Sequence, residues 1–171
     1  SCPDEAESLM YQAIQQFAAD RAAGKDGHSY IFFVGRENYP MSWIPGAQYP
    51  WGKAQVLSTG SDVVLIGCGV LVNKAIEAGK LLAAKGVKAT VISNPFVNQV
   101  DLETIGAAVK ACGGKVVTIE DHQLIGGMGA QVSHALSNAG IAHTLKTLGI
   151  NNEFCQSAYV AEELYVKHGL T

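Results

Sequence analysis

Arginine is scarce in this chain of 171 residues, in which Arg21 and Arg36 are the only two. The formal net charge is −3, and the lysines are spread along the chain without a run of like charge. Proteins that bind nucleic acid by charge carry a basic patch, and anionic membrane surfaces attract clustered basic residues. We therefore expect neither nucleic acid nor a membrane as a partner.

Long apolar segments and closely spaced cysteines are also missing. No stretch approaches the roughly 20 apolar residues that a membrane span requires, and the amino end is acidic where a secretory signal would be basic and then apolar. Four cysteines lie far apart, at Cys2, Cys68, Cys112 and Cys155, without a C-x-x-C pair. These features predict a cytoplasmic protein with free thiols and without a metal site.

The first third of the chain differs in pattern from the rest. Residues 4–23 begin with acidic residues and place apolar ones at helical spacing, which predicts a helix. Residues 29–34, SYIFFV, are apolar, aromatic and β-branched, which predicts a strand. Residues 35–53 contain three prolines and three glycines and predict a long loop. We expect a domain boundary here, between residues 1–51 and 52–171.

From residue 52 onward, buried strand patterns alternate with amphipathic helix patterns. Such alternation implies right-handed crossovers and a mostly parallel sheet with helices on both faces. The predicted fold class is therefore α/β, a three-layer α/β/α arrangement. The predicted strands are 62–69, 88–94, 115–121 and 142–149, and the predicted helices are 71–86, 101–114, 125–140 and 156–169.

One glycine-containing turn, GCGVLV at residues 67–72, partly matches a dinucleotide-binding fingerprint. The match fails because Val72 occupies the place of the third glycine. The next predicted strand also lacks the acidic residue that the fingerprint places about twenty residues further on. We interpret the segment as a tight turn between a strand and a helix.

A second turn lies in VTIEDHQLIGGMGAQV, residues 117–132, where Glu120, Asp121 and His122 lie at the carboxyl end of a predicted strand. A carboxylate and an imidazole can perform acid–base chemistry, and glycines can expose backbone amides to an anion. However, no P-loop lysine follows, and no nucleophile lies beside the histidine. Helix capping or a subunit contact explains the polar residues equally well. The glycines of this turn are Gly126, Gly127 and Gly129.

A third candidate is Arg36 in the segment GRENYP, directly after the strand predicted for residues 29–34. An arginine in a loop at a strand end can hold a carboxylate or a phosphate in two parallel hydrogen bonds. A surface ion pair with Glu37 or another acid explains the residue equally well.

Whole segments of the chain resemble the C-terminal domain of the transketolase family. This family of thiamine-diphosphate enzymes includes transketolase, 1-deoxy-xylulose-5-phosphate synthase and the β subunits of 2-oxoacid dehydrogenases. Residues 1–51 are similar to the last helix and last strand of the pyrimidine-binding domain, with an R-x-N-x-P match at Arg36, Asn38 and Pro40. The segments from residue 52 onward that carry the resemblance are GKAQVL, SDVVLIGCGVLVNKAIEAGKLLAAKGVKATVIS, VDLETI, VVTIEDHQLIGGMGAQV and LGINNEF with AEELYVKHGL.

The resemblance implies that the intact parent is a homodimeric two-carbon transferase of carbohydrate metabolism. It would act on sugar phosphates in the pentose phosphate pathway, with thiamine diphosphate and magnesium, and Arg36 would hold the phosphate of the substrate. The alternatives are the synthase, the dehydrogenase β subunit, or a stand-alone assembly module without catalysis.

The family's cofactor motif, which begins G-D-G and ends in asparagine, is absent from these residues. The catalytic glutamate of the family lies upstream of the matching region. We therefore expect no catalytic residue, no metal and no cofactor on this chain alone. We expect it to act with the pyrophosphate- and pyrimidine-binding domains, in cis or as a separate subunit. Glu120 and His122 are then candidates for domain or subunit contacts, and the three glycines for close packing.

Overall fold

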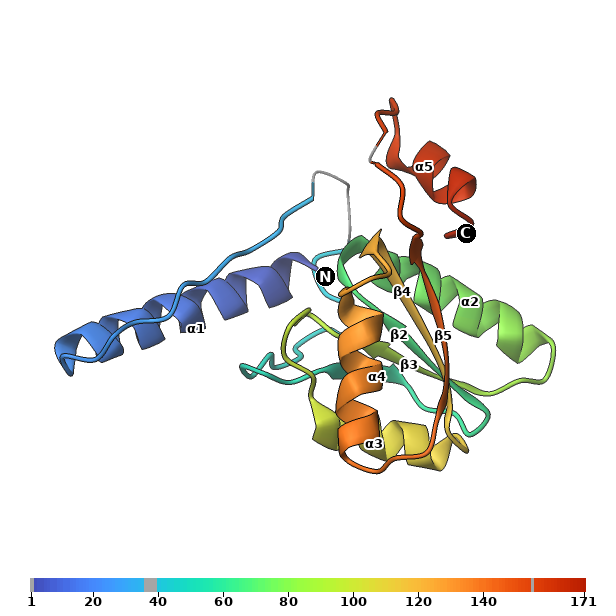
Figure 1. The fold of residues 1–171 in the computed structure, drawn as a ribbon, viewed down its shortest axis with the longest axis horizontal. Helices are drawn as coiled ribbons and strands as arrows, with labels where there is room; N and C mark the ends of the chain where they lie inside the picture. The colour runs from blue at the N-terminus through green and yellow to red at the C-terminus, as the bar shows by residue number, and fades with distance from the viewer. Residues whose placement is uncertain (1, 36–39, 155) are drawn as a thin grey trace. The chain divides into compact units, whose positions relative to one another are not determined.

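The computed structural model describes residues 2–35, 40–154 and 156–171 (Figure 1). The chain divides into two compact units, residues 1–51 and 52–171. Each unit has its own local architecture and is described separately.

The first unit is built around helix α1 (Pro3–Ala22). Proline in the first turn and the acidic Asp4 and Glu5 suit a helix N-terminus, where an amide donor is dispensable and the helix dipole favours negative charge. The Gln12 side chain holds the later loop against the helix. Its Nε2 donates to the Tyr49 carbonyl oxygen at 2.7 Å, and its Oε1 accepts from the Trp51 amide at 3.0 Å.

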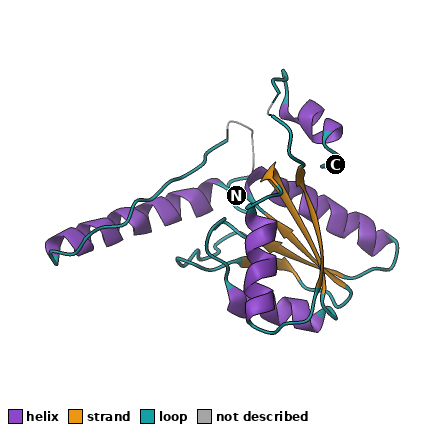
Figure 2. Cartoon of the chain, in the orientation of Figure 1, coloured by secondary structure: helices purple, strands orange, loops and turns teal. Residues whose placement is uncertain are grey.

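The strand predicted for residues 29–34 is not formed, and the segment is a loop (Figure 2). Ile31 and Phe33 are 77% and 89% exposed. The described part of this unit contains no strand, so the segment has no neighbour with which to pair its backbone groups. The prediction was wrong because β pattern alone cannot form a strand without a pairing partner.

The second unit contains a five-stranded sheet in the order β1-β3-β2-β4-β5. All neighbouring pairs are parallel except β1 with β3, which is antiparallel. The strands are β1 (Gln55–Ser58), β2 (Val63–Gly67), β3 (Ala89–Ser93), β4 (Lys115–Gln123) and β5 (Thr144–Ile150). The helices are α2 (Val72–Ala84), α3 (Leu102–Ala111), α4 (Met128–Asn138) and α5 (Ala161–Lys167), with a short 3-10 turn, η1 (Gly69–Leu71), before α2.

Helices cover both faces of this sheet, which confirms the predicted three-layer α/β class. Helices α3 and α4 lie on one face and α2 on the other (Figure 1). Side chains alternate along each strand, so neighbouring strand residues enter different cores. Ile66 packs with Ile105 and Met128 on the α3/α4 face, whereas Leu65 packs with Leu71 on the α2 face.

Asp101 ties the start of this unit to α3. This residue is 5% exposed, and its side chain accepts from the amides of Thr104 at 3.3 Å and Ala54 at 3.1 Å. The Lys53 ammonium lies 3.5 Å away. Burial alone would raise the pKa of Asp101, but the hydrogen bonds from Thr104 and Ala54 and the charge of Lys53 lower this pKa below its usual value.

Replacing Asp101 by asparagine is expected to reduce the pH dependence of stability in acid. Because the folded-state pKa is depressed, the stabilisation is complete above the unfolded-state value of about 3.9. It is lost as the pH falls through the folded-state pKa. Urea unfolding of Asp101→Asn at a series of pH values should show a shallower acid loss than the parent chain. Glu103→Gln, at an 84% exposed side chain, should leave that loss unchanged. Equal acid profiles for Asp101→Asn and the parent chain would contradict this assignment.

Candidate functional site at the carboxyl end of strand β4

The carboxyl ends of β2 and β4 are adjacent at the point where the strand order reverses. From β2 the chain crosses through α2 to β3 on one side, and from β3 it crosses through α3 to β4 on the other. In open α/β sheets, ligands bind outside the carboxyl ends of strands at such a switch point. The Cys68 amide donates to the Ile119 carbonyl oxygen at 3.2 Å, so the two glycine-containing turns of the sequence meet here.

Glu120 is the buried acid of this region, with 2% of its surface exposed. Its two carboxylate oxygens accept from the backbone amides of Met128 at 2.6 Å and Gly129 at 2.8 Å. These amides belong to the first turn of α4, whose N-cap residue Gly127 offers no side chain of its own. Glu120 therefore caps α4 from the neighbouring strand, where orphan donors and the helix dipole both favour a negative charge.

Two of the three glycines allow the close packing at this turn. A Cβ atom on Gly127 would lie 2.5 Å from a carboxylate oxygen of Glu120, and one on Gly129 would lie 2.5 Å from Thr118 Oγ1. Gly126 is different, because a Cβ there would meet no atom within 4 Å. Its φ of +78° is instead a conformation that glycine adopts without strain.

The occupied helix N-terminus determines what this turn can bind. The amides that would receive a phosphate in a glycine-rich loop already bind the chain's own carboxylate. An external anion would have to displace Glu120 and overcome its negative charge. The turn is thus a closed structural feature and offers no open phosphate site.

His122 lies near Glu120 in sequence but in a different environment. It is exposed, and its Nδ1 lies 3.2 Å from the Gln123 carbonyl oxygen. The structure therefore separates the two predicted site residues into a buried cap and a surface imidazole.

Gln123 is a residue that sequence reasoning missed. Its Nε2 donates to the Glu153 carbonyl oxygen at 2.6 Å, and its Oε1 accepts from the Asn152 amide at 3.0 Å. Asn152 has a φ of +55°. The carboxamide of Gln123 thus fixes the turn that follows β5, a long-range contact for which the sequence offers no periodic signal.

The remaining predicted residue, Arg36, lies outside the described residues. Among the residues that the structure describes, no group of three or more His, Cys, Asp or Glu side chains is placed to hold a metal ion. The sequence contains no G-D-G motif either. We therefore assign none of the described residues to thiamine diphosphate or magnesium, and no chemical step is placed on that group in this chain. In the same described part, no helix is both long and apolar enough to cross a membrane.

The profile of the family described as "Transketolase, C-terminal domain" matches residues 52–171. The chain belongs to this family. The match spans the whole second unit, including the β4–α4 turn and its capping glutamate.

Relatives and a solved structure extend this assignment. The 1-deoxy-D-xylulose-5-phosphate synthase of Microcystis aeruginosa is 36% identical over 122 residues, which are 71% of this chain and 19% of the relative. The enzyme of the same name from Thermomicrobium roseum is 38% identical over 109 residues, 64% of this chain and 17% of the relative. A solved structure described as a split-gene transketolase, inactive beta4 tetramer, has a TM-score of 0.76 and 32% identity. It matches 93% of this chain, which covers 51% of that solved chain.

The chain spans about a fifth of the curated relatives named here and about half of the solved transketolase chain. The match shows a transketolase-like C-terminal domain. The curated relatives support the synthase at least as well as transketolase itself, so both the synthase and the transketolase of the pentose phosphate pathway stay candidates for the parent enzyme.

Proposed function

We propose that this chain supplies the C-terminal domain of a thiamine-diphosphate-dependent, transketolase-like transferase. The observation that carries the proposal is the family match across residues 52–171. The domain's own role is structural, because its most site-like turn is closed by Glu120 and its sequence lacks the G-D-G motif. Pyrophosphate- and pyrimidine-binding domains, in cis or as a separate subunit of a homodimeric enzyme, would then hold the cofactor.

The first unit supports the same proposal. The solved split-gene transketolase matches 93% of the chain, or about 159 residues, which exceeds the 120 residues of the second unit. The likeness therefore reaches into residues 1–51. This is consistent with our proposal that they are the end of a pyrimidine-binding domain, within which Arg36 contacts the substrate phosphate.

His122 and the cysteines extend the proposal to a domain contact and to a cellular location. His122, which is exposed at the end of the sheet, is proposed to contact another domain of the enzyme. Cys2, Cys68 and Cys112 form no disulfide among the described residues, and we propose a reducing, cytoplasmic location for the enzyme.

We expect the cofactor-binding domains of the enzyme to cover the exposed apolar side chains of the first unit. Tyr11, Ile14 and Phe17 of α1 are exposed, as are Ile31 to Val34. Exposed apolar groups gathered in one small unit mark an interaction surface. We expect the chain by itself to self-associate, as seen by sedimentation velocity, and Phe33→Ser with Ile31→Ser to weaken that association. The matched control is Leu81→Ser, at a similarly exposed apolar residue of α2. A monomer at all concentrations would contradict the expectation.

Two reactions are candidates for the parent enzyme, and one experiment distinguishes them. Transketolase is favoured by the R-x-N-x-P segment at Arg36, and the synthase is favoured by the names of the curated relatives. The chain is to be co-expressed with the segment encoded upstream of it or in the adjacent gene, and purified as the complex. Two-carbon exchange between sugar phosphates would establish the first candidate, and formation of 1-deoxy-D-xylulose 5-phosphate the second. Activity of neither kind in a stable, cofactor-loaded complex would overturn the proposed function.

A further inference from the structure

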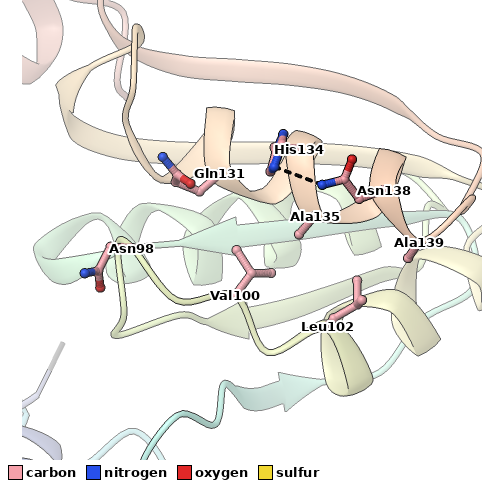
Figure 3. A pocket seen from close by; sticks show the side chains of 8 residues that line it. All are labelled: Asn98, Val100, Leu102, Gln131, His134, Ala135, Asn138 and Ala139. Atoms are coloured by element: carbon pink, nitrogen blue, oxygen red, sulfur yellow. Dashed lines mark hydrogen bonds between the residues drawn. The ribbon is translucent and has the colours of Figure 1, made fainter.

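A groove on the outer surface of α4 is independent of the β4–α4 turn and of the proposed function. It has a volume of about 450 Å³ and lies between α4 and the segment that leads from β3 into α3 (Figure 3). Small-molecule sites commonly measure about 300–1,000 Å³. The residues that line it are Asn98, Val100, Leu102, Gln131, His134, Ala135, Asn138 and Ala139.

The polar side of the groove is a stripe along one helix. Gln131, His134 and Asn138 are spaced by three and four residues, so they lie on one face of α4. Asn98 stands at one end of the stripe (Figure 3). Three of these four polar side chains are carboxamides, each of which presents both hydrogen-bond donors and an acceptor.

The rest of the groove lining is apolar. Val100 and Leu102 point toward α4, and the small Ala135 and Ala139 leave the space between them (Figure 3). Leu102 is 36% exposed although it is a large apolar residue. A flat ring lying between these groups would remove apolar surface from water.

One contact holds the polar stripe in place. Asn138 Nδ2 donates to His134 Nε2 at 2.9 Å, which puts the proton of a neutral imidazole on Nδ1. The Asn138 oxygen and its second N–H are left for a ligand, because this contact uses only one N–H. No Asp, Glu, Lys or Arg lines the groove, so its ligand has no charged partner among the lining residues.

We infer that this groove binds a neutral purine nucleoside, with the edge of the base against Asn138, the ribose toward Gln131 and the ring face against Val100 and Leu102. Asparagine and glutamine carboxamides pair with adenine through its N6 amino group and N7, a donor and an acceptor side by side. The ring packs against the apolar side chains of Val100 and Leu102. The lack of a lining cation disfavours a nucleotide phosphate.

The test is a titration of the full chain with adenosine, followed by ¹H–¹⁵N correlation spectra. We expect saturable shifts confined to residues 98–102 and to α4. Gln131→Ala and Asn138→Ala should each raise the dissociation constant by about 3- to 10-fold, the net value of one or two hydrogen bonds. Asn151→Ala, a carboxamide exposed outside the groove, is the matched control and should leave it unchanged.

One more variant and one more ligand complete the test. Ala139→Leu fills the groove from an exposed position and should abolish the saturable shifts while the rest of the spectrum stays folded. Adenosine monophosphate should bind no more tightly than adenosine. Shifts that never saturate, or equal weakening by Asn151→Ala and Gln131→Ala, would overturn the inference.

Discussion

Replacing Glu120 by alanine is expected to lower the free energy of unfolding of the second unit by about 3 kcal/mol. The change removes two charge-assisted hydrogen bonds and leaves the amides of Met128 and Gly129 buried without an acceptor. Hydrogen bonds to charged groups are each worth about 1.5–3 kcal/mol, and the loss of a helix cap costs about 1 kcal/mol. The measurement is urea unfolding at pH 7, followed by circular dichroism.

Two variants separate capping from a general effect of charge. Glu153→Ala removes an exposed carboxylate from the loop after β5 and should change stability by less than about 0.5 kcal/mol. Glu120→Gln keeps one acceptor oxygen but turns an amide donor toward the other backbone N–H, so we expect an intermediate loss of about 2 kcal/mol. Equal stability of Glu120→Ala and Glu153→Ala would show that the glutamate does not cap α4.

Replacing Gly129 by alanine is expected to destabilise the same unit by about 2 kcal/mol. The new Cβ would lie 2.5 Å from Thr118 Oγ1 and 2.7 Å from Thr147 Cγ2, both on strands of the packed sheet. Overpacking of this kind costs about 1–3 kcal/mol, and it opposes a gain of up to about 1 kcal/mol in helix propensity. The clash should therefore dominate, which thermal and urea unfolding would both detect.

Gly106 provides the control for this substitution, because it is a helical glycine whose nearest neighbour is the flexible end of a side chain. In Gly106→Ala the closest atom to the new Cβ is the terminal Cδ1 of Ile141, at 2.8 Å, which can rotate away. We expect this variant to remain within about 1 kcal/mol of the parent chain. Thr118→Ala combined with Gly129→Ala should recover part of the loss. A Gly129→Ala chain as stable as Gly106→Ala would contradict close packing at the turn.

The sequence predicted the second unit well because its signals are local. The buried β pattern of β2 and β3, the Asp101 cap of α3 and the amphipathic α2 and α4 each depend on residues within a few positions of one another. Strand β1 was missed because Gln55–Ser58 is only four residues long. Its antiparallel pairing with β3 is a long-range contact that periodicity does not encode.

The candidate site at the end of β4 likewise depends on contacts that the sequence pattern does not encode. Glycines and acids in residues 117–132 indicated a strand–helix turn, and both helix capping and anion binding remained open from sequence alone. Only the distances from Glu120 to the α4 amides show that the helix terminus is occupied. At residues 29–34 the sequence pattern was clear but misleading. The residues have a β pattern, but the described part of the first unit contains no strand with which their backbone could pair.

The central claim is that this chain supports a thiamine-diphosphate site which other parts of the enzyme build. The most direct measurement is calorimetric titration of thiamine diphosphate with Mg²⁺, first into the chain alone and then into its complex with the cofactor-bearing domains. We predict no saturable heat for the chain alone and saturable binding for the complex. Micromolar binding of thiamine diphosphate by the chain alone would contradict the claim.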